Sequence, residues 1–140
     1  MSISTIRTAL STALQNSTNF KAVYNFTPAD KAPRTPALIL QWKGTEVERL
    51  TFARAGVHDT NRAKHRFDVL IVIGALGQVP ALENDRDTFV DVLATGLTYY
   101  STLSGSAVDV QMGQIRPASF EWPDATIQGI AVEVVVTEDF

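Results

Sequence analysis

Hydrophobic residues recur every three or four positions in two segments of the chain. This period predicts an amphipathic helix over residues 2–15 and the longest helix of the chain over residues 80–103. The first apolar stripe consists of Ile3, Ile6, Leu10, Ala13 and Leu14. The second consists of Leu82, Phe89, Val90, Leu93, Leu97 and Tyr100.

Alternating apolar and polar residues predict strands along the rest of the chain. The predicted strands cover residues 20–26, 37–42, 46–53, 65–74, 108–115 and 127–137. The second and third are predicted to form a β-hairpin around a tight turn at Lys43-Gly44, although the inward face of the third is ambiguous. The strand at residues 65–74 becomes apolar on both faces toward its end, which indicates a central position in a sheet.

Three connectors without periodicity separate these elements. They cover residues 27–36, 54–64 and 117–124. The first connector is rich in proline, and the second is polar and basic. The third contains Phe120 and Trp122. It begins at Pro117, which is expected to end the strand before it. Surface connectors of this length are typical of segments that reach a partner.

The order of these elements predicts an α+β fold. The economical architecture is a single, mostly antiparallel sheet of five to six strands with two helices packed on one face. No repeat or boundary divides the chain, and 140 residues can bury a sizeable core. Residues 1–140 are therefore expected to form a single domain.

Composition narrows the class of protein. Hydrophobic residues make up 45% of the chain and charged residues 19%, which is typical of a globular protein and not of a disordered one. Cysteine is absent, which excludes disulfides and thiolate metal sites and fits a reducing compartment. The opening residues contain no continuous apolar run, so no signal peptide is predicted, and no stretch approaches the ~20 apolar residues of a membrane span.

Charge is divided unequally along the sequence. Residues 1–66 contain ten Lys and Arg against four acids, whereas residues 67–140 contain two against eleven, and the net charge is −3. Such a division can give a molecule one positive and one negative surface, through which copies associate head to tail. The alternative is that the two halves interleave in the fold and their charges mix on one surface.

Candidates for metal binding and hydrolysis each have a simpler structural interpretation. His58 and His65 have Asp59 and Asp68 nearby, but zinc sites usually use shorter spacings and the basic neighbours would repel a cation. The alternative is a pair of surface histidines. A Ser-His-Asp triad could be assembled from the residues present, but the Gly-x-Ser-x-Gly elbow of such enzymes is missing.

Nucleotide and nucleic-acid binding have equally weak signals. The Gly-Ala-Leu-Gly stretch at residues 74–77 resembles a dinucleotide-binding turn but lacks its third glycine, and the acids after it would repel a pyrophosphate. Those helix acids are better interpreted as partners of the helix dipole than as catalytic carboxylates. The basic stretch 54–66 could contact a phosphate, but it has no aromatic residues for base stacking. We therefore expect no enzyme activity, no cofactor and no metal.

The order of elements and several local stretches resemble the tail-terminator, or tail-completion, proteins of long-tailed bacteriophages. An amphipathic helix, a strand and a proline-rich loop lead into "PALILQW" at residues 36–42. "RFDVLIVIG" follows at residues 66–74, and after the long helix the chain closes with "IQGIAVEVVVTED" at residues 127–139. The resemblance is one of pattern and covers nearly the whole chain.

This resemblance implies a structural virion protein of the tail or neck, assembled in the host cytoplasm. Its copies would form a hexameric ring that caps the tail tube, stops polymerisation of the tube protein and offers a surface to the head–tail connector or head-completion protein. Membrane is not an expected partner, and nucleic acid only as DNA passing through the lumen. The alternatives are another neck, minor tail or head-completion protein, or a cellular α+β binding module.

The resemblance supplies no residue to carry over, so the expected interface rests on chemistry. Basic residues of the connectors in one copy are expected to meet acids of the long helix in the next, because a ring joins two different patches. The basic residues are Arg34, Arg54, Arg62 and Lys64, and the acids are Glu83, Asp87 and Asp91. Trp122 is the better candidate of the two tryptophans for an interface anchor, although a core position is the usual one for tryptophan.

Overall fold

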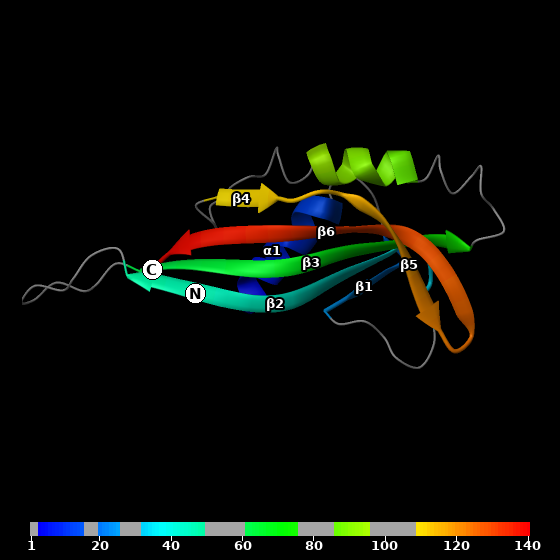
Figure 1. Ribbon diagram of the computed structural model, residues 1–140, viewed down its shortest axis with the longest axis horizontal. Coiled ribbons are helices and arrows are strands. Elements are labelled where there is room, and N and C mark those ends of the chain that lie inside the picture. Colours follow the sequence, from blue (N-terminus) through cyan, green and yellow to red (C-terminus); the bar gives the residue numbers. More distant parts are fainter. Residues whose placement is uncertain (1–2, 16–19, 26–31, 50–60, 76–85, 96–108) are drawn as a thin grey trace, which may run out of the picture.

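The computed structural model describes residues 3–15, 20–25, 32–49, 61–75, 86–95 and 109–140. The helices and strands are α1 (Ile3–Gln15), β1 (Ala22–Tyr24), β2 (Ala37–Arg49), β3 (Asn61–Ala75), a helix over residues 86–95, β4 (Asp109–Met112), β5 (Arg116–Trp122) and β6 (Ala125–Asp139). The sheet order is β1-β2-β3-β6-β4, and β5 also pairs with β6. Every pairing is antiparallel except that of β1 with β2 (Figure 1).

The predicted fold class is confirmed: the described residues form an α+β fold with two helices and a six-stranded, mostly antiparallel sheet. Both helices contribute to one buried cluster with one face of the sheet. This cluster contains Leu10 and Leu14 of α1, Phe89 and Leu93 of the second helix, and Phe67 of β3. The apolar stripes therefore bury themselves as their spacing predicts.

The central position of the strand at residues 65–74 is also confirmed. β3 lies between β2 and β6, and Ile71, Val72 and Ile73 are all buried although they alternate between the two faces. Val72 belongs to a second, smaller cluster on the opposite face from the helices. The rest of the predicted second helix, including Leu82, lies outside the described residues.

The predicted β-hairpin around Lys43-Gly44 is wrong. β2 runs through these residues without turning, and it pairs with β3 on both sides of a β-bulge between Trp42 and Gly44. Lys43 is the extra residue of the bulge, and Gly44 after it has a φ of 151°, a conformation that side chains disfavour. The bulge also explains the ambiguous pattern, because it changes which residues of β2 face the helices.

Two connectors also proved partly to be strands. Residues 61–64 belong to β3, and residues 116–122 form β5, which joins β6 through a turn at Pro123-Asp124. Pro117 does not end a strand, because β5 pairs only with β6 and a proline on such an edge removes no bond from the sheet. No helix among the described residues is long and apolar enough to cross a membrane.

Candidate functional site

β2, β3 and β6 are the longest strands of the sheet and extend beyond β1 at one end. β1 pairs only with residues 37–39 of β2, and β4 pairs only with residues 134–137 of β6. We call the end of these strands that lies beyond β1 the arm: residues 42–49 of β2, 61–67 of β3 and 133–140 at the end of β6, where β4 flanks residues 134–137. It forms the left end of the sheet in Figure 1. From Leu40 onward, the outer edge of β2 has no strand partner among the described residues.

The two faces of the arm differ because side chains alternate along each strand. On the face that carries the helices, Thr45 lies opposite His65 and Val47 lies opposite Ala63. On the other face, charged residues of β2, β3 and β6 lie side by side. They include Glu46, Arg62, Lys64, Arg66, Glu133 and Asp139.

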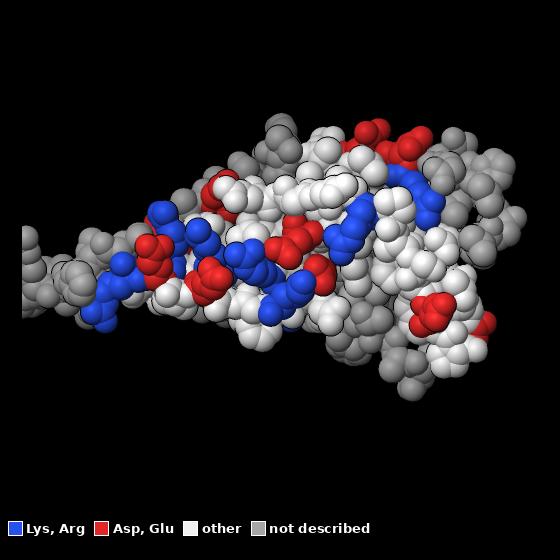
Figure 2. Space-filling view, in the orientation of Figure 1, with Lys and Arg blue, Asp and Glu red and all other residues white. Residues whose placement is uncertain are grey.

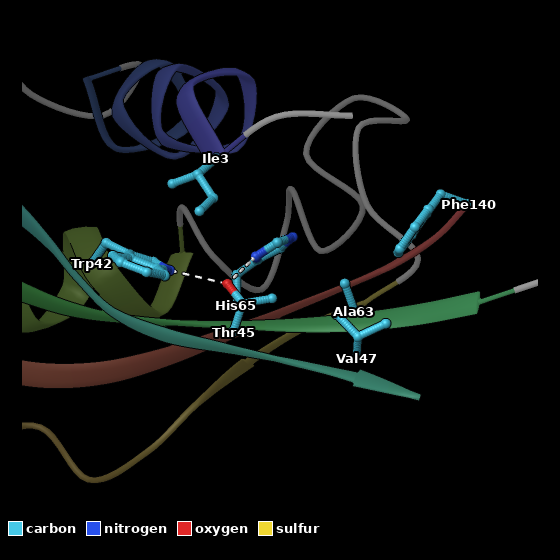
Figure 3. A pocket seen from close by; sticks show the side chains of 7 residues that line it. All are labelled: Ile3, Trp42, Thr45, Val47, Ala63, His65 and Phe140. Atoms are coloured by element: carbon cyan, nitrogen blue, oxygen red, sulfur yellow. Dashed lines mark hydrogen bonds between the residues drawn. The ribbon is translucent and has the colours of Figure 1, made fainter. Parts of the chain in front are cut away.

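The helix-side face of the arm contains an open hollow of about 400 Å³. It is lined by Ile3, Trp42, Thr45, Val47, Ala63, His65 and Phe140 (Figure 3). Three of these side chains are among the large exposed hydrophobics: Trp42 is 44% exposed, Val47 63% and Phe140 51%. Exposed apolar groups gathered at one place are typical of a surface that contacts another molecule.

A chain of polar contacts holds the floor of this hollow. The indole Nε1–H of Trp42 donates a hydrogen bond of 3.0 Å to Thr45 Oγ1, which lies 2.8 Å from His65 Nδ1. The tautomer of the His65 imidazole sets which of these two atoms donates, and Nε2 is the other ring nitrogen. That nitrogen lies 3.3 Å from Glu138 Oε2, and this contact between two buried atoms is not aligned as a hydrogen bond.

The alternative of a surface histidine is therefore wrong for His65, which is only 2% exposed. Strand alternation turns its basic neighbours Lys64 and Arg66 to the opposite face. His58 lies outside the described residues. Among those that are described, no three His, Cys, Asp or Glu side chains gather in a way that could hold a metal ion.

The charged face of the arm is built from ion pairs between distant parts of the sequence (Figure 2). Arg62 Nε lies 2.9 Å from Asp139 Oδ1, and Arg66 Nη1 lies 3.0 Å from Glu133 Oε1. The hydrogen bond from Arg62 lowers the pKa of Asp139 below its ordinary value. On this face, basic residues of the first half of the chain lie beside acidic residues of the second half. This agrees with the alternative that the two halves interleave in the fold, and not with separate positive and negative surfaces.

The predicted interface residues lie on several surfaces. Arg34 is exposed just before β2, and Lys64 is exposed on the charged face of the arm beside the half-buried Arg62. Asp87 and Asp91 are exposed on the helix over residues 86–95. Arg54 and Glu83 lie outside the described residues. The contacts that all these predicted interface residues make in an assembly stay a prediction.

The two tryptophans occupy the reverse of the positions that the sequence suggested. Trp122 is 8% exposed and packs in the second cluster, with its ring centroid 6.0 Å from that of Phe120. Trp42 is the exposed one. The hollow could not be predicted from the sequence, because Trp42 and Val47 are five residues apart and would point to opposite faces of a regular strand. The bulge shifts the alternation by one residue and places both side chains on the same face.

The comparisons with known proteins found little similarity. No protein-family model matches the chain, and no curated protein matches it in sequence. Among solved structures, the chain is similar to one in the virion of a native gene transfer agent (GTA) particle, with 13% sequence identity and a TM-score of 0.45. That similarity covers 95% of this chain and 94% of the other. A similarity of this degree does not assign a function.

Proposed function

We propose that the protein is a structural component of a phage-type virion and acts as a tail terminator. Its copies form a ring, hexameric as the resemblance implies, that caps the tail tube and stops its growth. The opposite side of the ring offers the surface for the head–tail connector. In this proposal the protein has no catalytic role.

The arm is the observation that carries the proposal. It exposes Trp42, Val47 and Phe140 together on one face, beside an edge of β2 that has no partner strand among the described residues. Burying one large apolar side chain contributes roughly 1.5–3 kcal/mol. An open strand edge pairs readily with another chain. Both features favour a protein that is completed by assembly.

The resemblance noted in the sequence agrees with the fold at the level of its elements. The stretches at residues 36–42 and 66–74 form the paired parts of β2 and β3 at the centre of the sheet, and residues 127–139 form most of β6. These three strands also build the arm. Of the segments that carry the resemblance, Trp42, residues 66–67 and the end of β6 belong to the arm.

Native mass spectrometry of the purified protein tests the assembly. We expect a closed ring for the wild type and its loss in the double variant Trp42→Ser/Val47→Ser. A matched control is Val23→Ser, which changes a side chain of β1 that is 39% exposed and lies outside the arm. A monomer at high concentration, or a ring that survives the double variant, would contradict the proposed role of the arm.

A tail-assembly assay separates a terminator from another neck protein. With its cognate tube protein, the ring is expected to stop tube growth at a fixed length, and removal of this chain is expected to give tubes of uncontrolled length in electron micrographs. Tubes of normal length without this chain would assign it to another place in the neck.

The hollow supports a second candidate, a small-ligand binding module. Its volume of about 400 Å³ falls within the range of small-molecule sites, and Thr45 and His65 are polar groups in an otherwise apolar lining. This candidate expects a monomer that retains a bound small molecule in native mass spectra. The double variant would then lose that ligand.

A further inference from the structure

Two strand edges of the sheet lie open on opposite sides. On one side, β2 has no partner strand from Leu40 to Arg49, and on the other, β4 is the last strand of the order β1-β2-β3-β6-β4. Both statements concern the part of the chain that the structure describes. An open edge is a liability that proteins usually cover by pairing it or blocking it.

The directions of the two edges are compatible. β2 is antiparallel to β3, β3 to β6, and β6 to β4, so β4 runs opposite to β2. When a second copy is placed beside the first in the same orientation, its β2 lies antiparallel to the β4 of the first. Antiparallel pairing continues the pattern of the rest of the sheet.

The two edges also lie at the same level of the sheet. Met112 pairs with Val134, Val134 with Phe67, and Phe67 with Trp42. At the other end of β4, the same chain of partners leads from Asp109 to Glu46. β4 is therefore level with residues 42–46 of β2, which are open, so two copies can meet without a large shift along the strands.

We propose that β4 of one copy pairs antiparallel with residues 42–46 of β2 in the next copy, so that one continuous sheet runs around the ring. The occupant of the open β2 edge is a second copy of this chain. The inference rests on the proposed function, because it names the contact through which the ring closes.

Side chains on the helix side support this pairing. Val110 and Met112 pack partly buried against the main core, on the same face as Trp42. In the joined sheet, Met112 of one copy lies beside Trp42 of the next, and the exposed indole gains an apolar neighbour. Cross-strand pairs of large apolar residues stabilise a sheet.

Acidic and basic residues both lie on the other face of this contact. Lys43 lies at the bulge, and its Nζ is 3.7 Å from Asp68 and 3.8 Å from Glu133 at the open edge of β2. In this register Asp109 of one copy lies opposite Glu46 of the next, and Glu46 lies 3.8 Å from Arg66 of its own copy. Two acids opposite each other do not stabilise the pairing, so the contact rests on the paired backbone and on the apolar helix side.

A head-to-tail contact uses both open edges, whereas a symmetric one does not. If two β2 edges paired with each other, both β4 edges would stay open and assembly would stop at a dimer. Pairing β4 with β2 joins two different patches, and it repeats from copy to copy until the ring closes. This is the geometry that a terminator ring needs.

The absence of cysteine makes disulfide cross-linking a direct test. Directly opposite residues of an antiparallel pair have Cβ atoms about 4.5–5.5 Å apart, close to disulfide geometry. The double variant Trp42→Cys/Met112→Cys is expected to form, on oxidation, a ladder of linked species up to the full ring. A matched control, Val23→Cys/Met112→Cys, is expected to lose this ladder.

The single variants fix the geometry of the contact. Trp42→Cys alone and Met112→Cys alone are expected to give no linked species, and their mixture is expected to give linked dimers containing one of each. Linking of Trp42→Cys with itself would show a symmetric β2 pairing and overturn the proposal. Linking only after addition of a different virion protein would assign the edge to that protein and overturn it as well.

Hydrogen exchange of the unchanged protein gives a second measurement that needs no substitution. Amides in residues 40–49 and 109–112 are expected to gain protection when the ring forms, while those of β1 do not change. The protein could form a ring while the double cysteine variant gives no linked species and the amides of these residues gain no protection. That result would overturn the pairing of β4 with β2 and leave the proposed function standing. A protein that forms no ring at all would instead refute the proposed function.

Discussion

Replacing Gly129 by alanine tests a close approach of β6 to β3. Gly129 of β6 pairs with Val72 of β3 beside the bulge between Val72 and Gly74. A Cβ atom at this position would overlap the backbone carbonyl oxygen of Ile71 and would lie 3.0 Å from the Phe120 ring. The obstacle is main chain of the central strand, which cannot turn aside as a flexible side chain would.

The magnitude follows from what must move. Relieving the overlap separates β3 from β6 locally, and losing about two hydrogen bonds costs roughly 1–3 kcal/mol. Overpacking of the neighbouring side chains adds roughly 1–3 kcal/mol. We therefore expect Gly129→Ala to lower the free energy of unfolding by about 2–6 kcal/mol, a large part of the stability of an ordinary domain.

Urea unfolding, followed by circular dichroism, measures this loss. The matched control is Gly113→Ala, because a Cβ atom there would meet only Glu133 O at 3.5 Å, an ordinary contact. With a slope of about 1–3 kcal/mol per M urea, the loss in Gly129→Ala shifts the midpoint by at least about 0.7 M. Equal midpoints for the two variants would refute the argument that β3 and β6 touch at Gly129.

Two further predictions concern the arm. Arg62→Ala is expected to return the pKa of Asp139 upward toward 3.8, because the hydrogen bond from Arg62 is the largest cause of its lowering, and an NMR titration of the carboxyl carbon measures this. Since the folded pKa of Asp139 is the lowered one, the pair stabilises the fold above pH ~4. The stability difference between wild type and Arg62→Ala should therefore shrink as the pH falls through that lowered pKa, and a difference independent of pH would contradict the pairing. Thr45→Val is expected to cost roughly 1–3 kcal/mol, because it leaves the buried Nδ1 of His65 without its partner. The same change should broaden or shift the Trp42 indole N–H signal in a proton–nitrogen NMR spectrum, and an unchanged signal would show that Thr45 does not hold the indole.

Local sequence predicted those features that depend on periodicity alone. The stripe of α1 is buried at Ile6, Leu10 and Leu14, since a helix with one apolar face has one way to cover it. The apolar run at Ile71 to Ile73 indicated a central strand, because both faces of such a strand must be covered. The α+β class follows from counting these elements.

The candidate site could not be predicted in the same way, because its residues meet only through strand pairing. The sequence Lys43-Gly44 is compatible with a turn and with a bulge. In the structure β2 pairs with β3 both before and after these residues, which makes them a bulge. That choice placed Trp42 and Val47 on one face. His65 has basic neighbours in sequence, but the register with β2 and β6 buries it between Thr45 and Glu138.

The distribution of charge shows most clearly what each level decided. The sequence determined that one half of the chain is basic and the other acidic, because this requires only a count. The antiparallel register of β3 with β6 decided that Arg62 meets Asp139, 77 residues away, on a shared surface. Ion pairing depends on distance in space, which the sequence does not contain until the strands are aligned.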